Sequence, residues 1–287
     1  MSVQERRFET GDGVRLRVED RNREAPGTPL LLLHGFTGSV EAWGEELLRR
    51  LADGRRVMAV DLHGHGGSDA PEEPERYHLA RVLDDLEELL TELAVPRAVW
   101  VGYSMGGRVA LGAGVLRPAR VAALVLESTT PGLADPLERR ARRMSDEALA
   151  RRIETGGPRG MEAFVDGWME LPLFASQRRL PAHVLEAERF RRLGGSPTGL
   201  AGTLRGLGTG SQPSFWSELG RVEAPALVLT GSLDGKYEGI GDAMAEALPG
   251  AVRRSVEGAG HTVHLEQPDR WLDEVDSFLT TLEEAEA

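Results

Sequence analysis

The sequence of 287 residues contains no cysteine and a single lysine, Lys236. The absence of cysteine excludes disulfides, zinc–thiolate sites, iron–sulfur clusters and a thiol nucleophile. No GxxxxGKS/T motif surrounds the one lysine, so phosphate-loop chemistry has no basis and Schiff-base chemistry would rest on that residue alone. Arginine supplies the other 33 basic residues. Most lysine- and cysteine-dependent reactions are therefore excluded.

Positive net charge and long apolar runs are also lacking. The formal net charge is −12, which argues against nucleic acid as the main partner. No stretch approaches 18 consecutive apolar residues, and the opening MSVQERRFETGDG contains no apolar signal core. These features predict a cytoplasmic protein that does not associate with membranes, and we expect a monomer or a weak homo-oligomer. Hydrophobic residues make up 40% of the chain, enough for a sizeable core.

Short apolar runs alternate with helical patterns in the first half of the chain. The runs cover residues 29–33, 57–60, 98–101 and 121–126, and apolar and polar residues do not alternate within them. Such runs are typical of strands covered on both faces of a parallel sheet. The clearest helical pattern, residues 79–93, has leucines and valines on one side and acids on the other. The order predicts an α/β fold with right-handed crossovers.

This alternation stops after residue 126 and resumes near the end of the chain. Residues 131–212 have the pattern of helices broken by glycine and proline, with no convincing strand. Strands at 226–230 and 251–256 then alternate with helices at 240–248 and 268–282. We therefore predict a core formed by residues 1–130 and 213–287, interrupted by a helical cap over 131–212.

Charge differs between the predicted cap and the predicted core. The cap carries 13 arginines and ten acidic residues, whereas the rest of the chain carries 21 basic and 36 acidic residues. An anionic ligand beneath the cap is one explanation of this difference. The other is that the arginines solvate helix faces and stack on their neighbours.

The segment Gly102-Tyr103-Ser104-Met105-Gly106 follows one predicted strand and precedes a helical pattern. A G-x-S-x-G motif in this context predicts a serine nucleophile on a strained turn, where only small residues on either side leave room. An oxyanion hole would take one N–H from Met105 and another from Phe36, in the turn after residues 29–33. We interpret His34 in that turn as structural.

The acid and the histidine should follow the serine in this order. Asp234 follows the predicted strand 226–230, and His261 lies in a glycine-rich loop after the last strand. We therefore predict a triad in which Asp234 orients the His261 ring and His261 takes the proton of Ser104. His264 is predicted to lie behind the site or at the surface.

A competing motif lies at residues 61–69, which read DLHGHGGSD. It is similar to the H-x-H-x-D-H zinc motif of metallo-hydrolases. Gly67 stands where that motif has an acid, and no histidine follows it. We predict a structured loop beside the active site, with no metal and no other cofactor.

Five segments, HGFTGS, DLHGHGGSD, GYSMGG, GSLD and AGH, span almost the whole chain in an order that resembles the α/β-hydrolase superfamily. The resemblance implies a mostly parallel sheet flanked by helices, with an inserted helical cap. GYSMGGR, ESTTPGL, RRMSDE, FVDGWMELPLFASQ, LRGLGTGSQPSFW and AGHTVHLEQP further resemble the 2-succinyl-6-hydroxy-2,4-cyclohexadiene-1-carboxylate synthases of menaquinone biosynthesis. One departure is His63, where that family usually has proline in DxPGHGxS.

The narrower resemblance implies a lyase that eliminates pyruvate from 2-succinyl-5-enolpyruvyl-6-hydroxy-3-cyclohexene-1-carboxylate, with the triad acting as base. This small anionic substrate has three carboxylates, which guanidinium groups bind through paired hydrogen bonds. The motif positions imply these substrate-binding residues: Arg108, Arg142, Trp168, Arg189, Tyr103 and, as a weaker candidate, Gln212.

Two other functions stay open at this point. The first is a hydrolase of esters or carbon–carbon bonds that uses the same triad covalently. The second is a non-catalytic ligand-binding module of the same fold, against which the intact triad argues. Haloalkane dehalogenases and epoxide hydrolases are disfavoured because they carry aspartate at the position of Ser104.

Overall fold

An eight-stranded sheet lies at the centre of the computed structural model, which describes residues 2–286. Its strand order is β1-β2-β4-β3-β5-β6-β7-β8. β3 to β8 run parallel to one another, whereas β1 pairs antiparallel with β2 and β2 with β4. The strands are β1 (Val3–Glu9), β2 (Arg15–Arg21), β3 (Leu30–Leu33), β4 (Val57–Val60), β5 (Ala98–Tyr103), β6 (Val121–Glu127), β7 (Ala226–Gly231) and β8 (Val252–Val256).

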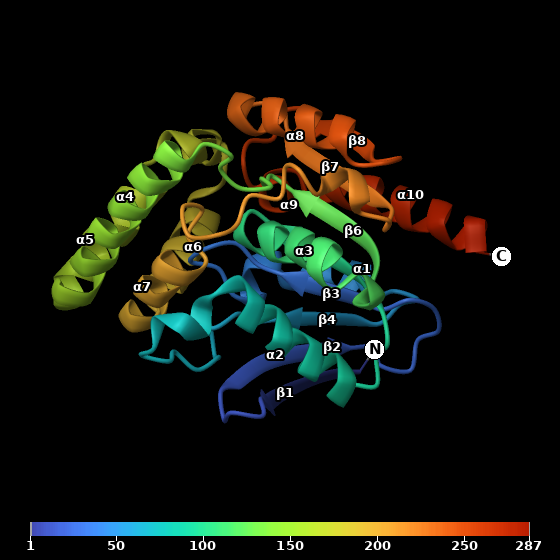
Figure 1. Ribbon diagram of the computed structural model, residues 1–287, viewed down its shortest axis with the longest axis horizontal. Coiled ribbons are helices and arrows are strands. Elements are labelled where there is room, and N and C mark those ends of the chain that lie inside the picture. Colours follow the sequence, from blue (N-terminus) through green and yellow to red (C-terminus); the bar gives the residue numbers. More distant parts are fainter. Residues whose placement is uncertain (1, 287) are drawn as a thin grey trace.

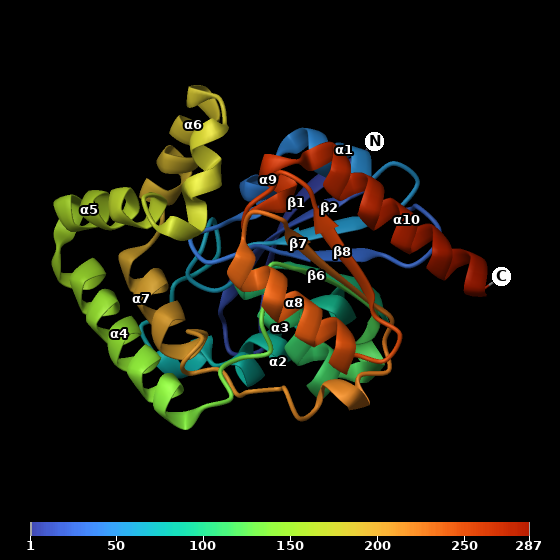
Figure 2. The same cartoon turned by 90° about the horizontal axis from the view of Figure 1, so that it is seen from above.

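Helices cover both faces of the sheet and stand beside one end of it. α2, α3 and α8 pack on one face, α1 and α10 pack on the other, and α4 to α7 form a separate group to one side (Figures 1 and 2). The α-helices are α1 (Glu45–Leu51), α2 (Leu79–Glu92), α3 (Met105–Leu116), α4 (Pro136–Thr155), α5 (Gly157–Met169), α6 (Ala182–Leu193), α7 (Pro197–Gly206), α8 (Gly235–Ala247), α9 (Val263–Glu266) and α10 (Pro268–Glu286). The 3-10 helices are η1 (Val40–Trp43), η2 (Pro74–Tyr77), η3 (Pro118–Arg120), η4 (Pro172–Arg179) and η5 (Leu219–Arg221).

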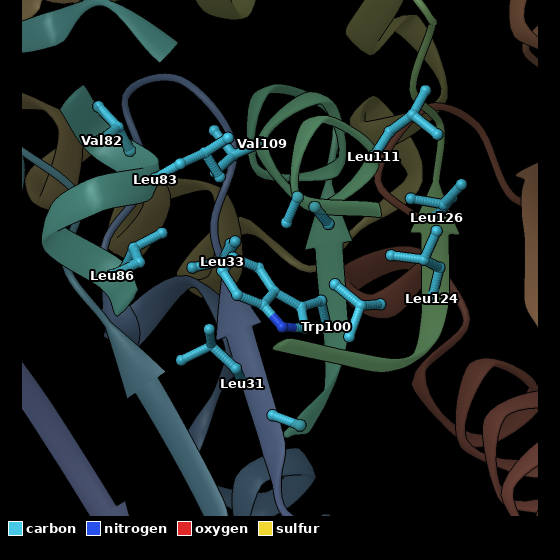
Figure 3. Packing of buried hydrophobic residues seen from close by; sticks show 14 of the residues in the cluster. Leu31, Leu33, Val82, Leu83, Leu86, Trp100, Val109, Leu111, Leu124 and Leu126 are labelled. Atoms are coloured by element: carbon cyan, nitrogen blue, oxygen red, sulfur yellow. The ribbon is translucent and has the colours of Figure 1, made fainter. Parts of the chain in front are cut away.

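The central strands are apolar throughout because both of their faces are covered. In β3, Leu31 and Leu33 face α2 and α3, whereas Leu30 and Leu32 face α1 and α10, as the period of two along a strand requires. Figure 3 shows Trp100 of β5 among the leucines of the first face. This packing confirms the α/β fold with a mostly parallel sheet.

The helical group α4 to α7 has a small core of its own. Ile153 of α4, Val165 of α5 and Leu204 of α7 are buried together, and Phe36 from the loop after β3 packs against them. We call residues 131–212 the lid. The division of the chain into a core of residues 1–130 and 213–287 and a cap of residues 131–212 stays a prediction. None of the helices in residues 2–286 combines the length and apolarity that crossing a membrane requires.

Two strands at the edge of the sheet were missed by the sequence patterns. β1 and β2 read VQERRFE and RLRVEDR, and both are rich in charge because β1 forms the outer edge. In β2 the apolar residues Leu16 and Val18 alternate with partly exposed residues, and the other buried residues, Asp20 and Arg21, are charged. A search for continuous apolar runs finds strands with two covered faces and overlooks such charged strands.

The structure also differs from the prediction at α8. This helix begins at Gly235, five residues before the predicted start at residue 240.

Candidate active site

Ser104 lies on a turn that only small neighbours allow. Its backbone has φ 50° and ψ −103°, a strained conformation between β5 and α3. A Cβ atom on Gly106 would come within 1.9 Å of the Leu33 carbonyl oxygen, and one on Gly102 within 2.4 Å of the Gly106 carbonyl oxygen. The turn also donates the Ser104 N–H to the carbonyl of Glu127, at 2.8 Å. The hydroxyl is thereby held above the end of the sheet.

The three predicted triad residues come together in one chain of hydrogen bonds. His261 Nε2 lies 3.1 Å from Ser104 Oγ, and His261 Nδ1 lies 2.7 Å from Asp234 Oδ2. Because the carboxylate can only accept, Nδ1–H donates to Asp234, and Nε2 is left to accept the serine proton. His261 is buried, and Asp234 is held in turn by the N–H of Tyr237 at 3.3 Å. The geometry suits proton transfer from serine to histidine.

The predicted oxyanion-hole residues flank the serine. Met105 is the first residue of α3, where a backbone N–H has no partner within the helix. Phe36 follows β3 and lines the same cavity as Ser104. The next residue, Thr37, has φ 65°, and its carbonyl accepts a hydrogen bond from Arg191 of α6 at 2.9 Å. The lid therefore helps to hold the loop that carries Phe36.

Two buried histidines, His34 and His65, form hydrogen bonds that hold the loop carrying Phe36. His34 Nδ1 donates to the Gly35 carbonyl at 2.8 Å and His34 Nε2 accepts the Leu62 N–H at 3.0 Å, which fits the structural role expected for it. His65 Nε2 accepts the Thr37 N–H at 3.3 Å. Burial lowers the pKa of His34 to about 4 and the pKa of His65 to about 3. Both rings are therefore neutral near pH 7.

Residues 61–69 form the structured loop that was expected beside the active site. His63 Nε2 pairs with the buried Asp85 of α2 at 2.7 Å. Asp61 accepts the N–H groups of Val40 at 2.6 Å and Gly67 at 2.8 Å. These contacts tie the loop to its neighbours and occupy the side chains of the zinc-like motif.

A cavity of about 680 Å³ lies between the triad and the lid. Ser104, Asp234 and His261 line its core side, and Trp168 and Arg142 line its lid side. The predicted residues Phe36, Met105, Tyr103 and Arg108 also line it. The hydroxyl of Tyr103 lies 2.7 Å from the Thr262 hydroxyl, so the ring contributes mainly an apolar wall.

Two arginines give the cavity positive charge. Arg108 is buried, and its Nη1 donates to Gln212 Oε1 at 2.7 Å and to the Leu207 carbonyl. Burial lowers the pKa of this guanidinium to about 10, which leaves it charged near pH 7. Arg142 Nε donates to Asp146 Oδ1 at 2.8 Å, and burial raises the pKa of that carboxyl. Gln212 does not line the cavity itself and contacts it only through Arg108.

The structure does not bring Arg189 to the cavity, in contrast to the prediction from motif spacing. Its side chain is exposed on α6, and its Nε donates to Asp166 of α5 at 2.7 Å. Other lid arginines form similar pairs: Arg151 with Glu147, Arg178 with Glu170, Arg192 with Glu188 and Arg205 with Glu154. Of the 13 lid arginines, only Arg142 lines the cavity that contains the triad in the described structure. At least five of the lid arginines thus pair with lid acids away from the cavity that holds the triad.

Sequence reasoning missed a buried network behind His261. Glu127, at the end of β6, accepts hydrogen bonds from the ring of His264 at 2.9 Å and from Trp271 Nε1 at 2.9 Å. Gln177 of the lid donates to the Thr262 hydroxyl at 2.9 Å. His264 is therefore buried behind the site, and its predicted surface alternative is wrong. The sequence did contain a signal for this network, because Glu127 is an acidic residue directly after the apolar run 121–126.

Comparisons with known proteins agree with this geometry. Residues 28–268 match the family model described as alpha/beta hydrolase fold. The chain is 42% identical over 271 residues to a Bacillus subtilis (strain 168) protein provisionally named 2-succinyl-6-hydroxy-2,4-cyclohexadiene-1-carboxylate synthase, which covers 94% of this chain and 97% of that protein. It is 32% identical to the synthase of that name from Salmonella newport (strain SL254), over 88% of this chain and 95% of that one. The solved structure of MenH from S. aureus matches with a TM-score of 0.85 and 30% identity, over 99% of this chain and 100% of that one.

Replacing Gly106 by alanine tests the packing of the serine turn. We expect Gly106→Ala to lower the free energy of unfolding by about 1–3 kcal/mol or more, because the new methyl group would overlap the Leu33 carbonyl. Gly239→Ala is the control, since its Cβ would meet nothing within 4 Å inside α8 and should stabilise by about 0.5–1 kcal/mol. Chemical denaturation measures both. Equal stability of the two variants would contradict the packing account.

The two neutral histidines predict a loss of stability in mild acid. The unfolded chain binds protons at histidine below about pH 6.5, whereas His34 and His65 resist protonation while folded. The free energy of unfolding should therefore fall as the pH drops from about 6.5 toward 5, by up to about 1.4 kcal/mol per pH unit for each. His65→Asn should flatten this slope, whereas replacing the exposed His183 should leave it unchanged. Identical slopes for the wild type and His65→Asn would refute the assignment.

Proposed function

The chain belongs to the alpha/beta hydrolase fold family, and we propose that within it this protein is a 2-succinyl-6-hydroxy-2,4-cyclohexadiene-1-carboxylate synthase, a lyase of menaquinone biosynthesis. One observation carries the proposal: the hydrogen-bonded Ser104, His261 and Asp234 share a cavity with the cations Arg108 and Arg142. A base beside two guanidinium groups suits a substrate with a removable proton and several carboxylates.

The names of substrate and product define the bond changes. The substrate is 2-succinyl-5-enolpyruvyl-6-hydroxy-3-cyclohexene-1-carboxylate, and the reaction removes its C2 hydrogen and its C5 enolpyruvyl group. The electron pair of the C2–H bond forms the C2–C3 double bond, the C3–C4 double bond moves to C4–C5, and the C5–O bond breaks. The released enolpyruvate takes up a proton and becomes pyruvate. No water is consumed, and the reaction needs no cofactor.

The triad supplies the base in this proposal. His261 takes the hydroxyl proton of Ser104, and the serine oxygen takes the C2 proton, which the neighbouring succinyl ketone makes acidic. Asp234 stabilises the imidazolium that forms. No bond forms between the serine and the substrate, which distinguishes this reaction from that of an esterase.

The oxyanion hole stabilises the enolate that follows. Loss of the C2 proton places negative charge on the succinyl ketone oxygen, and the N–H groups of Phe36 and Met105 would donate to it. Each such donor contributes roughly 3 kcal/mol to transition-state stabilisation in comparable sites. Collapse of the enolate then expels enolpyruvate. The same hole would serve ester hydrolysis, because that reaction also develops charge on a carbonyl oxygen.

The walls of the cavity bind the rest of the substrate. Arg108 and Arg142 hold carboxylates, Trp168 and Tyr103 contact the ring, and Gln212 acts by orienting Arg108. The proposed partner is thus a small anionic carboxylate. A cytoplasmic location and a monomeric or weakly homo-oligomeric state stay predictions.

Release of pyruvate by the purified protein tests the function. Supplied with the enolpyruvyl substrate, the wild type should release one pyruvate per substrate, measured by coupling to lactate dehydrogenase. Ser104→Ala should lower kcat by roughly 10²- to 10⁴-fold, because it removes the base. Faster cleavage of p-nitrophenyl esters than of the substrate would favour a hydrolase. Unchanged activity in Ser104→Ala would favour a non-catalytic module with contaminating activity.

Two arginines of α4 form a matched test of the carboxylate contacts. Arg142→Gln should lower kcat/KM by roughly 10- to 100-fold, mainly through KM, because a charged hydrogen bond contributes about 1.5–3 kcal/mol. Arg151→Ala is the control, since that side chain points into solvent and pairs with Glu147 on the same helix. Thermal melting checks that both variants fold. Equal kinetics for Arg142→Gln and Arg151→Ala would remove Arg142 from the binding site.

A further inference from the structure

The only lysine of the chain lies at the active-site cavity. Lys236 is exposed in the first turn of α8, two residues after Asp234, and it lines the cavity together with Arg108 and Arg142. The other 33 basic residues of the protein are arginines. The one lysine of the sequence therefore lies at the cavity that contains the triad.

The ammonium group of Lys236 has no carboxylate partner in the described part of the chain. Among the ion pairs formed by residues 2–286, none involves this ammonium group, whereas Arg142 pairs with Asp146. The first turn of a helix favours anions, because the backbone N–H groups there carry partial positive charge. A lysine without a carboxylate partner at this end of α8 gains nothing from the helix. A negative group from outside the chain would explain its position.

One aromatic ring connects the three cations. The Lys236 Nζ atom lies 5.5 Å from the centre of the Tyr237 ring. The charges of Arg108 and Arg142 both act on the hydroxyl of Tyr237, which also lines the cavity. The three positive groups thus line the same cavity as this ring. Arg108 is buried at its inner wall, whereas Lys236 is exposed at its rim.

The number of cations matches the proposed substrate. Three carboxylates require three positive contacts, and motif spacing assigned the third to Arg189, which instead pairs with Asp166 on the outside of the lid. Resting on the proposed function, we propose that Lys236 binds the substrate carboxylate that Arg108 and Arg142 leave free. Lys236 is a specificity-determining residue in this account, and it takes no part in proton transfer.

The chemistry of lysine fits a contact at the rim. An ammonium group is a point charge on a flexible stem, so it can follow a carboxylate whose position varies as the substrate enters. A guanidinium fork demands a fixed planar geometry, which suits the buried wall better. We therefore expect Lys236 to contribute to capture of the substrate more than to the elimination step.

Charge removal at one position tests the proposal. Lys236→Met keeps the length of the stem and removes the charge, and Lys236→Arg keeps the charge. We expect Lys236→Met to raise KM for the enolpyruvyl substrate roughly 5- to 10-fold with little change in kcat, because the contact is partly exposed. Lys236→Arg should restore most of the loss. The KM of the wild type should also rise more steeply with sodium chloride than that of Lys236→Met.

Substrate analogues identify the carboxylate. Each of the three carboxylates is replaced in turn by a carboxamide, and the effect of Lys236→Met is measured on every analogue. For one analogue the variant and the wild type should have equal KM, because the charge pair is already lost. An effect of Lys236→Met that is the same on all three analogues would overturn the proposal and indicate a structural role.

The outcomes separate this inference from the proposed function. Pyruvate release by the wild type, with unchanged kinetics in Lys236→Met, would overturn the role of Lys236 and leave the synthase activity intact. No pyruvate release by the wild type would overturn both.

Chemical labelling of the only lysine gives a second measure of the contact. The protein is treated with an amine-selective acetylating reagent, and acetylation of Lys236 is followed by peptide mass spectrometry. The substrate should slow labelling of Lys236 at least several-fold, and equal labelling rates with and without it would contradict the contact.

Discussion

The buried end of β6 is the constraint on which the active site depends. The backbone carbonyl of Glu127 accepts the N–H of Ser104, and its carboxylate accepts hydrogen bonds from His264 and Trp271. One residue thereby holds the serine turn and the segment that follows His261. A buried acid without such donors would cost several kcal/mol, so this arrangement is stable only when complete. The serine turn and the segment after His261 are both hydrogen-bonded to Glu127 at the end of β6. This shared partner holds Ser104 Oγ and His261 Nε2 3.1 Å apart.

The arginines of the lid and of the cavity wall beneath it serve two purposes that the amino-acid sequence alone does not separate. Exposed arginines on the lid helices pair with acids one turn or one helix away, and such pairs contribute little individually. The buried Arg108 and the cavity-facing Arg142 lie where water is partly excluded, and there a charge acts more strongly on a bound carboxylate. Position relative to the cavity, and not the total of arginines, determines the electrostatics of the site.

Much of the fold and of the catalytic centre could be predicted because the signals are local. Strands covered on both faces are apolar throughout, and the Ser104 turn needs glycines at fixed positions. Three kinds of feature could not be predicted. β1 is a charged edge strand without a continuous apolar run, Arg189 depends on how α6 is turned, and Glu127 depends on a partner 137 positions away in the sequence. All three features depend on tertiary packing, which cannot be predicted from the spacing of residues in the sequence.

The central claim is that a hydrolase triad here removes a proton from carbon and adds no water. Turnover in oxygen-18 water tests this most directly, with the cyclohexadiene product and the intact protein both analysed by mass spectrometry during the reaction. The account predicts an unlabelled product, one pyruvate per substrate and an unchanged protein mass. Oxygen-18 in the cyclohexadiene product, or a substrate-derived adduct on Ser104, would contradict it.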